Sequence, residues 1–455
     1  MIESLLELND AVNAVVWGPP FLILLVGTGV YLTVRLNFFQ FTHFKLSWDQ
    51  SFGRYFSKEA EDEGGVLSSF QAISSAMAAT LGVGNIAGVS TALSLGGPGA
   101  IFWMWICALF GMATKFAEAQ LGIKYREKKG EDDFTGGVMY YIQNGMGGKW
   151  KWLAVLYAFF AGIAAFGIGN MVQSNTLAHA AEDGFAVPTW LTGILVVFFV
   201  ALVILGGVKR IGRVAERLVP IMAIFYFIGG GLIIILHIGS VPAVFADIFT
   251  KAFTPASAFG GFAGATVRMA VRFGVARGVF SNEAGLGAAS IIHAQARNKP
   301  TRQGMWGIWE VFIDTIIVGT ITALVVLLTG ALGTGETGAV LAAEGFSRGL
   351  PGPGGYIINT SIIIFAYTTM LTWSFYGEES WRYIFGKGVV VPYRFLFLGF
   401  LFLGAVGALE PIWLLADTLN GLMAAPNLIA LIVLAGVVAK EKDNYMEELT
   451  RPAEE

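Results

Sequence analysis

The stretch LGVGNIAGVSTA (residues 81–92) decides the fold of this chain, because glycine and asparagine interrupt a segment that is otherwise apolar. A second stretch, RGVFSNEAGLGAAS (residues 277–290), repeats the pattern Asn-x-Ala-Gly. Each glycine inside a helix costs roughly 1 kcal/mol relative to alanine. Unwound backbone is tolerated at membrane depth only where it is buried in protein or lines a cavity. The two stretches therefore predict two related halves, each beginning with a broken helix, as in secondary transporters.

The composition indicates a membrane protein. The chain has 455 residues, of which 55% are hydrophobic and 13% are charged, and its mean hydropathy is +0.66. Soluble domains are about 25% charged. The net charge of −3 does not suggest a nucleic-acid partner. The one cysteine, Cys107, excludes an internal disulfide, and no Cys/His spacing resembles a zinc site. The opening residues MIESLLELND lack a basic segment, so we expect no cleavable signal peptide.

Eleven segments are long and apolar enough to be membrane spans, which need about 20 mainly apolar residues. We predict them at residues 12–35, 68–95, 97–123, 150–181, 188–208, 213–239, 262–293, 303–333, 354–379, 389–408 and 411–439. With eleven spans, most of the 29 Lys and Arg residues fall on one side, and the opposite loops contain only Lys251 and Arg348. Positive charge favours cytoplasmic loops. We therefore predict a multi-pass protein of the cell membrane with an outer N-terminus and a cytoplasmic C-terminus.

The spans also predict an inverted repeat. If the helix at 12–35 is an extra N-terminal helix, two sets of five remain, at residues 68–239 and 262–439. Because five is odd, the second set must enter the membrane in the opposite orientation. We expect an all-α polytopic fold in which residues 1–455 form one transporter domain. The breaks near Gly82–Gly84 and near Gly274–Gly278 are expected to face each other in the middle of the membrane.

Two motifs carry a family resemblance. Residues 96–111, GGPGAIFWMWICALFG, and residues 280–287, FSNEAGLG, resemble signatures of the alanine-or-glycine:cation symporter family, and the likeness extends over nearly the whole chain. The resemblance implies the leucine-transporter-like, five-plus-five fold of the amino acid–polyamine–organocation superfamily. It also implies sodium-coupled uptake of alanine or glycine by alternating access, with sodium as the co-transported cation, without covalent chemistry and with no other cofactor.

The first break can recognise both ends of an amino acid. Backbone amides at a helix N-terminus bind anions. The candidate carboxylate donors are the amides of Gly82, Val83 and Gly84, and Asn85 next to them is a further candidate substrate contact. Carbonyls at the end of the preceding half-helix suit an ammonium group or sodium, and they belong to Ala78, Ala79 and Thr80. Alternatively, the glycines serve only close helix packing.

Further candidate contacts lie on two other helices. Around the second break we expect substrate contacts from Phe273, Gly274 and Ala276. In the span 150–181, one helical face at i, i+4, i+7 spacing presents Phe166, Asn170 and Gln173. Polar amides at this depth can instead hold helices together.

The resemblance places a sodium ion between the first broken helix and the helix at 354–379. The ligands it implies are the carbonyls of Ala78 and Leu81 with hydroxyls from Thr368, Thr369 or Thr372. Threonines in membrane helices often bond back to their own turn instead. Phe365 and Trp373 are candidate walls of the substrate pocket, although isolated aromatic residues in membrane helices usually serve packing.

Buried charges leave a second coupling mechanism open. Glu283 is expected to pair with Arg277, Arg272 or a helix terminus, because an unpartnered intramembrane carboxylate is costly. Arg268 and Arg272 are expected to line or gate an outer vestibule. Pairs between helices are expected from Lys115, Glu118, Glu310, Asp314 and Asp417.

The alternative to sodium coupling is a proton-coupled amino acid symporter of the same fold that uses Glu283 or Asp314. A channel is a rival of another class, and a membrane enzyme is disfavoured because no nucleophile–base pair or cofactor motif appears at membrane depth. The predicted partners are alanine or glycine, sodium and the lipid bilayer. Stoichiometry and oligomeric state are not determined by the sequence.

Overall fold

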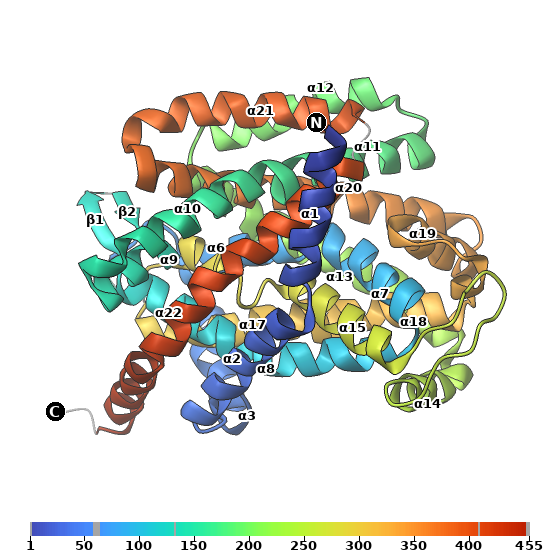
Figure 1. Cartoon of the computed structure of the whole chain (residues 1–455), viewed down its shortest axis with the longest axis horizontal. Coiled ribbons are helices and arrows are strands. Elements are labelled where there is room, and N and C mark those ends of the chain that lie inside the picture. The colour runs from blue at the N-terminus through green and yellow to red at the C-terminus, as the bar shows by residue number, and fades with distance from the viewer. Residues whose placement is uncertain (1, 58–63, 132, 408–409, 452–455) are drawn as a thin grey trace.

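Long apolar helices build the molecule, as the composition requires. We describe a computed structural model over residues 2–57, 64–131, 133–407 and 410–451 (Figure 1). Within these residues, eight helices are long and apolar enough to cross a membrane, and a ninth span results if the bent pair Ser69–Thr80 and Gly84–Gly96 is counted as one. Each of the eleven predicted spans coincides with helical structure. The total of eleven spans stays a prediction.

The N-terminal region and the first predicted half are helical apart from one small hairpin. Their elements are α1 (Ile2–Val16), α2 (Pro19–Arg35), α3 (Phe39–Thr42), α4 (Phe44–Trp48), η1 (Asp49–Gly53), α5 (Arg54–Phe56), α6 (Ser69–Thr80), η2 (Gly84–Gly88), α7 (Val89–Gly96), α8 (Gly99–Lys124), β1 (Glu127–Gly130), β2 (Asp133–Thr135), α9 (Val138–Tyr140), η3 (Tyr141–Met146), η4 (Gly148–Trp150), α10 (Lys151–Phe166), η5 (Gly167–Met171), α11 (Val172–Phe185), α12 (Thr189–Ile204) and α13 (Val208–Leu236). Strands β1 and β2 pair antiparallel.

After α13, a 3₁₀ turn and one helix on the predicted outer side lead into the second predicted half. The elements are η6 (Ile238–Ser240), α14 (Val241–Lys251), α15 (Val267–Asn282), α16 (Ala289–His293), α17 (Pro300–Val311), η7 (Phe312–Gly319), α18 (Thr320–Leu328), η8 (Ala331–Thr334), α19 (Gly338–Gly349), α20 (Pro353–Phe385), η9 (Lys387–Val389), α21 (Val390–Val406) and α22 (Glu410–Thr450). The segments η1, η2, η3, η5 and η7 are π-helical, and the other η segments are 3₁₀ turns.

Both broken helices begin at hydroxyl caps. At α6, the Ser68 hydroxyl accepts a hydrogen bond from the Gln71 amide at 3.0 Å, and the Gln71 side chain accepts one from the Ser68 amide at 3.1 Å. This reciprocal arrangement is a capping box, which fixes where a helix starts. At α15, the Thr266 hydroxyl accepts from the Met269 amide at 3.2 Å. Corresponding elements of the two halves are thus started by the same local chemistry.

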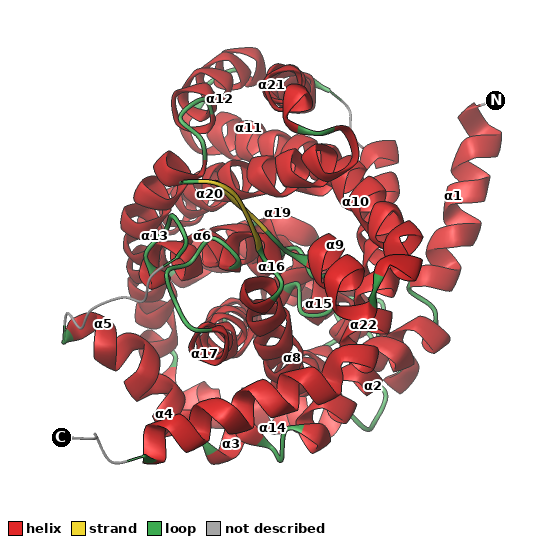
Figure 2. Cartoon of the chain, turned by 90° about the vertical axis from the view of Figure 1, so that its left-hand side faces the viewer, coloured by secondary structure: helices red, strands yellow, loops and turns green. Residues whose placement is uncertain are grey.

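The helices are arranged around the two broken ones. Helix α8 packs along α15 and α17, and α20 packs against α6, α10 and α11. Helices α12 and α21 lie side by side at one edge of the molecule in both views (Figures 1 and 2). The long helix α22 contacts α1, α2 and α10 and crosses one face of the molecule in Figure 1. The broken helices α6–α7 and α15–α16 are therefore enclosed by the rest of the chain.

Candidate transport site

The first break lies where the glycines predict it. Helix α6 ends at Thr80, Leu81 leaves the helix with ψ of 68°, and η2 begins at Gly84. The two half-helices are bent by 47° relative to each other. A Cβ at position 82 would lie 2.6 Å from the Thr369 hydroxyl oxygen, so a larger residue there would displace Thr369. The Gly82 amide donates to the Thr80 carbonyl at 2.7 Å, so one of the three predicted carboxylate donors is already engaged.

The second break is displaced from its predicted position. Helix α15 continues without interruption through Gly274 and Gly278, so the expectation of a break there is wrong. The chain leaves the helix at Glu283, which has a φ of 55°, and Gly285 and Gly287 follow with φ of 98° and 79°. Such left-handed backbone suits glycine and is uncommon for glutamate. The break therefore spans residues 283–288, which begin inside the motif Asn-Glu-Ala-Gly-Leu-Gly (residues 282–287) and end one residue after it.

The glycines at 274 and 278 serve packing instead. A Cβ on Gly274 would run into the Ala100 carbonyl, and one on Gly278 would lie 3.3 Å from the Cys107 Cβ, so both allow α8 to approach α15 closely. Phe273, Gly274 and Ala276 consequently lie in regular helix, more than a turn before the break. The prediction of substrate contact depended on a break next to these residues, and the structure has no break there.

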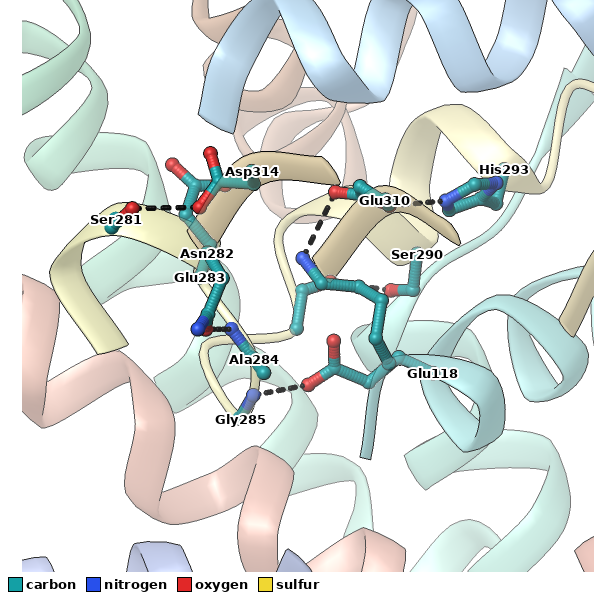
Figure 3. Close-up of polar contacts among 12 residues, drawn as sticks. Glu118, Ser281, Asn282, Glu283, Ala284, Gly285, Ser290, His293, Glu310 and Asp314 are labelled. Atoms are coloured by element: carbon teal, nitrogen blue, oxygen red, sulfur yellow. Dashed lines mark hydrogen bonds and ion pairs between the residues drawn. The ribbon is translucent and has the colours of Figure 1, made fainter. Parts of the chain in front are cut away.

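The motif asparagines of the two halves converge on one π-helical segment. Asn85 donates its side-chain amide to the Asp314 carboxylate at 2.8 Å, and Asn282 donates to the Thr315 hydroxyl at 3.0 Å. The Ser281 hydroxyl donates to the other Asp314 oxygen at 2.6 Å (Figure 3). All five side chains are buried. Segment η7, which carries Asp314 and Thr315, therefore connects the two breaks, and π-helical segments are frequent at functional sites.

Sequence reasoning missed part of this network. We expected an ion pair for Asp314, but its hydrogen-bond partners among the described residues are neutral donors, and no ion pair of Asp314 is found there. Ser281 and Thr315 were not singled out, and neither was Thr322, whose hydroxyl donates to the Asn85 carbonyl at 2.9 Å. The available signal was the polar series Asp314, Thr315, Thr322 in an otherwise apolar span.

Other buried charges pair between helices in part as predicted. Lys115 lies 3.1 Å from Glu310, whose other oxygen lies 3.0 Å from the His293 ring (Figure 3). Glu283 pairs with neither Arg277 nor Arg272. It accepts a hydrogen bond from the Trp373 indole at 3.0 Å, so the predicted ion pair is wrong.

A carboxylate from a neighbouring helix fixes the second break. Glu118 accepts from the Gly285 amide at 2.9 Å (Figure 3). It also accepts from the Asn427 side chain at 2.7 Å. Asn427 also donates to the Gly285 carbonyl at 2.9 Å and contacts the Tyr141 hydroxyl. Both backbone polar groups of Gly285 are thereby satisfied by side chains of α8 and α22, as buried backbone requires.

Two of the three predicted sodium-binding threonines face the first broken helix. The Thr369 hydroxyl lies 2.9 Å from the Ala78 carbonyl, and the Thr372 hydroxyl lies 2.9 Å from the Ser75 carbonyl. Thr368 points elsewhere, since its hydroxyl donates to the Phe365 carbonyl at 3.0 Å and contacts the Met222 sulfur at 3.5 Å. The structure thus brings Ala78, Thr369 and Thr372 together and separates Thr368 from them.

Several predicted substrate contacts have unused hydrogen-bonding atoms. Within the described residues, no partner is found for the buried side-chain oxygens of Thr80, Asn85, Asn170 and Gln173. Buried polar atoms are normally satisfied, so each exception calls for an explanation such as a missing ligand or water. Because four of the predicted contacts share this property, they suit a polar ligand.

The remaining predicted contacts have packing partners. Segment η5 interrupts the regular helix of 150–181, so the i, i+4, i+7 face assumed for Phe166, Asn170 and Gln173 does not persist. Phe166 packs 5.0 Å from the Phe400 ring, and the Asn170 amide donates to the Phe397 carbonyl at 2.8 Å, both on α21. Phe365 packs 5.6 Å from Tyr226 on α13. Trp373 lies tightly against Gly169.

Comparisons with known proteins agree with this architecture. The sodium:alanine symporter family matches residues 2–455. The sodium/alanine symporter AgcS of Methanococcus maripaludis is 46% identical over 97% of this chain and 97% of its own. A probable sodium/glutamine symporter of Bacillus subtilis, GlnT, is 34% identical over 98% of this chain and 92% of its own.

A solved structure shares the fold at low sequence identity. The structure of MhsT in complex with L-phenylalanine superposes with a TM-score of 0.61 at 15% identity, over 84% of this chain and 93% of that one. This likeness establishes the leucine-transporter-like fold. Because the family match covers nearly every residue, the chain belongs to the sodium:alanine symporter family and is a multi-pass membrane transport protein rather than an enzyme.

Proposed function

We propose that the protein is a sodium-coupled symporter that carries alanine or glycine into the cell by alternating access. The observation that supports this most directly is the junction of the two broken helices at η7, through Asn85, Asn282 and Asp314. A site shared by both halves changes its exposure when one half rocks against the other, which is how inverted-repeat transporters alternate. In this proposal the N-terminus is outside, the C-terminus is cytoplasmic, and the protein lies in the cell membrane.

The sodium ion would bind between α6 and α20. Sodium is a hard cation that prefers oxygen ligands. The Ala78 carbonyl and the hydroxyls of Thr369 and Thr372 already lie on facing surfaces of these two helices. The Leu81 carbonyl, at the end of the half-helix, is the fourth proposed ligand. Leu81 lies at the break, and Thr369 lies against Gly82 within it. Sodium binding would therefore stabilise the bent form that also receives the substrate.

The amino acid would bind at the first break, next to the sodium. Its carboxylate would accept hydrogen bonds from the amides of Val83 and Gly84, at the start of a half-helix. Its ammonium group would donate to unused oxygens of Thr80, Asn170 or Gln173. Gly82 lies against Thr369 and Gly169 against Trp373, both on α20, so these walls leave little space for a longer side chain.

Binding of radiolabelled alanine to the purified protein tests this proposal. We expect saturable binding in sodium buffer that glycine competes for and leucine does not, and a large loss when potassium replaces sodium. Equal binding in the two salts would contradict sodium coupling. Binding of leucine as strong as that of alanine would contradict the small pocket.

Proton coupling is the second candidate, and one observation favours it. Glu118 and Glu283 are buried and each has one carboxylate oxygen without a hydrogen-bond partner among the described residues. A buried carboxylate that lacks such a partner is most easily accommodated with a proton bound. Alanine uptake driven by an imposed pH gradient, in the absence of sodium, would support this mechanism over the first.

A further inference from the structure

A polar pocket lies at the predicted cytoplasmic ends of α10 and α20. It has a volume of about 260 Å³, and its walls also come from the hairpin β1–β2, from α9 and η3, and from the turn that follows α20. Figure 1 shows this hairpin at one edge of the molecule, beside α10. Pockets for drug-sized ligands have about 300–1,000 Å³. This pocket therefore suits a smaller polar group.

Basic side chains dominate the charge of this pocket. The basic residues in its walls are Lys129, Lys151, Arg382 and Lys387. Of the described lining residues, one is a carboxylate, Glu127, and it forms an ion pair with Lys129. Basic pockets between membrane helices on the cytoplasmic side bind the anionic headgroups of lipids. The charge of the walls therefore indicates a site for a phosphate group.

Carboxylates outside the walls offset only part of this positive charge. Arg382 donates to Asp133 at 2.7 Å and to Glu379 at 3.0 Å, and Lys387 also pairs with Asp133. Together with the lining carboxylate, three acidic side chains face four basic ones. Lys151 is exposed and has no ion pair among the described residues. An anion at Lys151 would therefore gain a partner without breaking an existing pair.

An exposed aromatic surface continues from the pocket toward the bilayer. Trp152 directly follows Lys151 and is 59% exposed, and Phe385 at the end of α20 is 64% exposed. Trp381 connects the two helices, because its ring centroid lies 6.3 Å from that of Phe159 on α10 and 5.7 Å from that of Phe385. Tryptophan is enriched where a membrane meets water. The pocket is therefore expected at the level of the lipid headgroups, with the aromatic surface at the level of the acyl chains.

We propose that this pocket binds the phosphate of an anionic phospholipid from the cytoplasmic leaflet, while the acyl chains of that lipid pack on Trp152, Phe159 and Phe385. A free phosphate ion has the same charged group, but only a lipid also covers the adjoining aromatic surface. The site uses the proposed orientation, in which the hairpin is cytoplasmic. It goes beyond the proposed function, because it does not depend on which amino acid or cation the protein carries.

Native mass spectrometry of the full-length protein in detergent, titrated with phosphatidylglycerol or with phosphatidylcholine of the same acyl chains, tests the site. We expect the wild type to retain phosphatidylglycerol at lower lipid concentrations than phosphatidylcholine. The double variant Lys151→Gln/Lys387→Gln is expected to weaken phosphatidylglycerol binding roughly thirtyfold, the effect of removing two basic residues from an anionic lipid surface. Asp133 retains its hydrogen bonds from Arg382 in this variant.

The matched control is Lys45→Gln/Lys440→Gln. It removes the same charge from two exposed positions that do not line the pocket. We expect this control to bind phosphatidylglycerol as the wild type does.

Inorganic phosphate distinguishes a lipid site from a site for a free anion. Trp152→Ala is expected to weaken phosphatidylglycerol binding severalfold, because it removes part of the apolar surface that the acyl chains cover. Inorganic phosphate, added as a competitor, is expected to leave the lipid bound. Displacement of phosphatidylglycerol by inorganic phosphate, together with unchanged lipid binding in Trp152→Ala, would assign the pocket to a free anion and overturn the lipid site.

Two further outcomes would overturn the lipid site. One is equal retention of phosphatidylglycerol and phosphatidylcholine by the wild type. The other is equal weakening of phosphatidylglycerol binding in the two double variants. The first comparison needs no variant, so a poorly folded variant does not protect the proposal. Neither measurement involves alanine or sodium, so failure of the lipid site leaves the proposed symport function untouched.

Discussion

At the scale of single residues, the three threonines of α20 show that the direction in which a side chain points decides its contacts more than its residue type does. Thr369 and Thr372 are three positions apart and share a helix face, and both contact carbonyls of α6. Thr368 is adjacent in sequence but points about a quarter-turn away, to Met222 on α13. The sequence could nominate all three as oxygen ligands, but only the rotation of α20 about its axis separates them.

This separation gives a matched pair of variants. Replacing both Thr369 and Thr372 by alanine is expected to raise the sodium concentration that half-saturates alanine binding by roughly tenfold, because the two lost polar contacts together contribute about 1–2 kcal/mol. Thr368→Ala removes a hydroxyl one position away and is expected to leave the half-saturating sodium concentration unchanged. The measurement is a sodium titration of labelled alanine binding. An effect of Thr368→Ala as large as that of the double variant would contradict a sodium site between α6 and α20.

A second residue-scale prediction concerns Asp314. Its carboxylate accepts hydrogen bonds from Asn85, Ser281 and Thr315. In Asp314→Asn the amide NH₂ would face a donor, which costs about 1–3 kcal/mol for an unsatisfied buried group. We expect weaker sodium-dependent alanine binding and a lower unfolding temperature. Ser281→Ala removes one bond at the same carboxylate and should have a smaller effect, and equal effects would argue against a central role for Asp314.

At the scale of elements, the two breaks are built differently although their motifs match. The first is a short interruption between α6 and η2, with a bend of 47°. The second is a loop of left-handed residues between α15 and α16, fixed by Glu118 and Asn427. The glycines before the second motif seemed equally able to break a helix. They do not, because α8 packs closely against them and this packing stabilises a regular helix there.

The left-handed loop predicts a position-specific sensitivity to alanine. Gly287 has a φ of 79°, and a Cβ there would overlap Val138 and lie 2.9 Å from Asn427. Gly287→Ala is expected to destabilise the protein by about 1–3 kcal/mol, seen as a lower unfolding temperature in detergent. Gly231→Ala, on α13 with nothing within 4 Å of the added Cβ, is the control and should leave the temperature the same or higher. Equal unfolding temperatures of the two variants would show that the loop conformation is not required.

At the scale of the whole molecule, the distribution of charge sets the orientation, and this can be measured with two cysteines. In a Cys107→Ser background, Glu336→Cys lies on the predicted outer side and Glu131→Cys on the predicted cytoplasmic side, and both positions are exposed. A membrane-impermeant maleimide should label Glu336→Cys in intact cells and Glu131→Cys only after permeabilisation, because positive loops stay in the cytoplasm. The reverse pattern would invert the proposed direction of the halves.

The sequence by itself determined the membrane class, the positions of the helices and the first break. These follow from local chemistry, because hydropathy over about 20 residues and the backbone preferences of glycine act within one segment. The family resemblance, rather than local chemistry, singled out Ala78, Thr369 and Thr372, and the structure places both threonines against α6. The hydropathy pattern leaves residues 334–353 outside the predicted spans, yet they contain α19, whose buried face packs on α18 and α20.

Only the tertiary structure decided where the second break lies, which threonines face α6, and that Asn85 and Asn282 meet at η7. Each of these depends on contacts between different helices, such as that of Asn85 with Asp314, which are 229 positions apart. The π-helical segments η2, η5 and η7 change the direction in which every later side chain of the same helix points. No local pattern of residues predicted these segments. Which face of a helix meets its neighbour is a property of packing, and packing is determined by the whole chain.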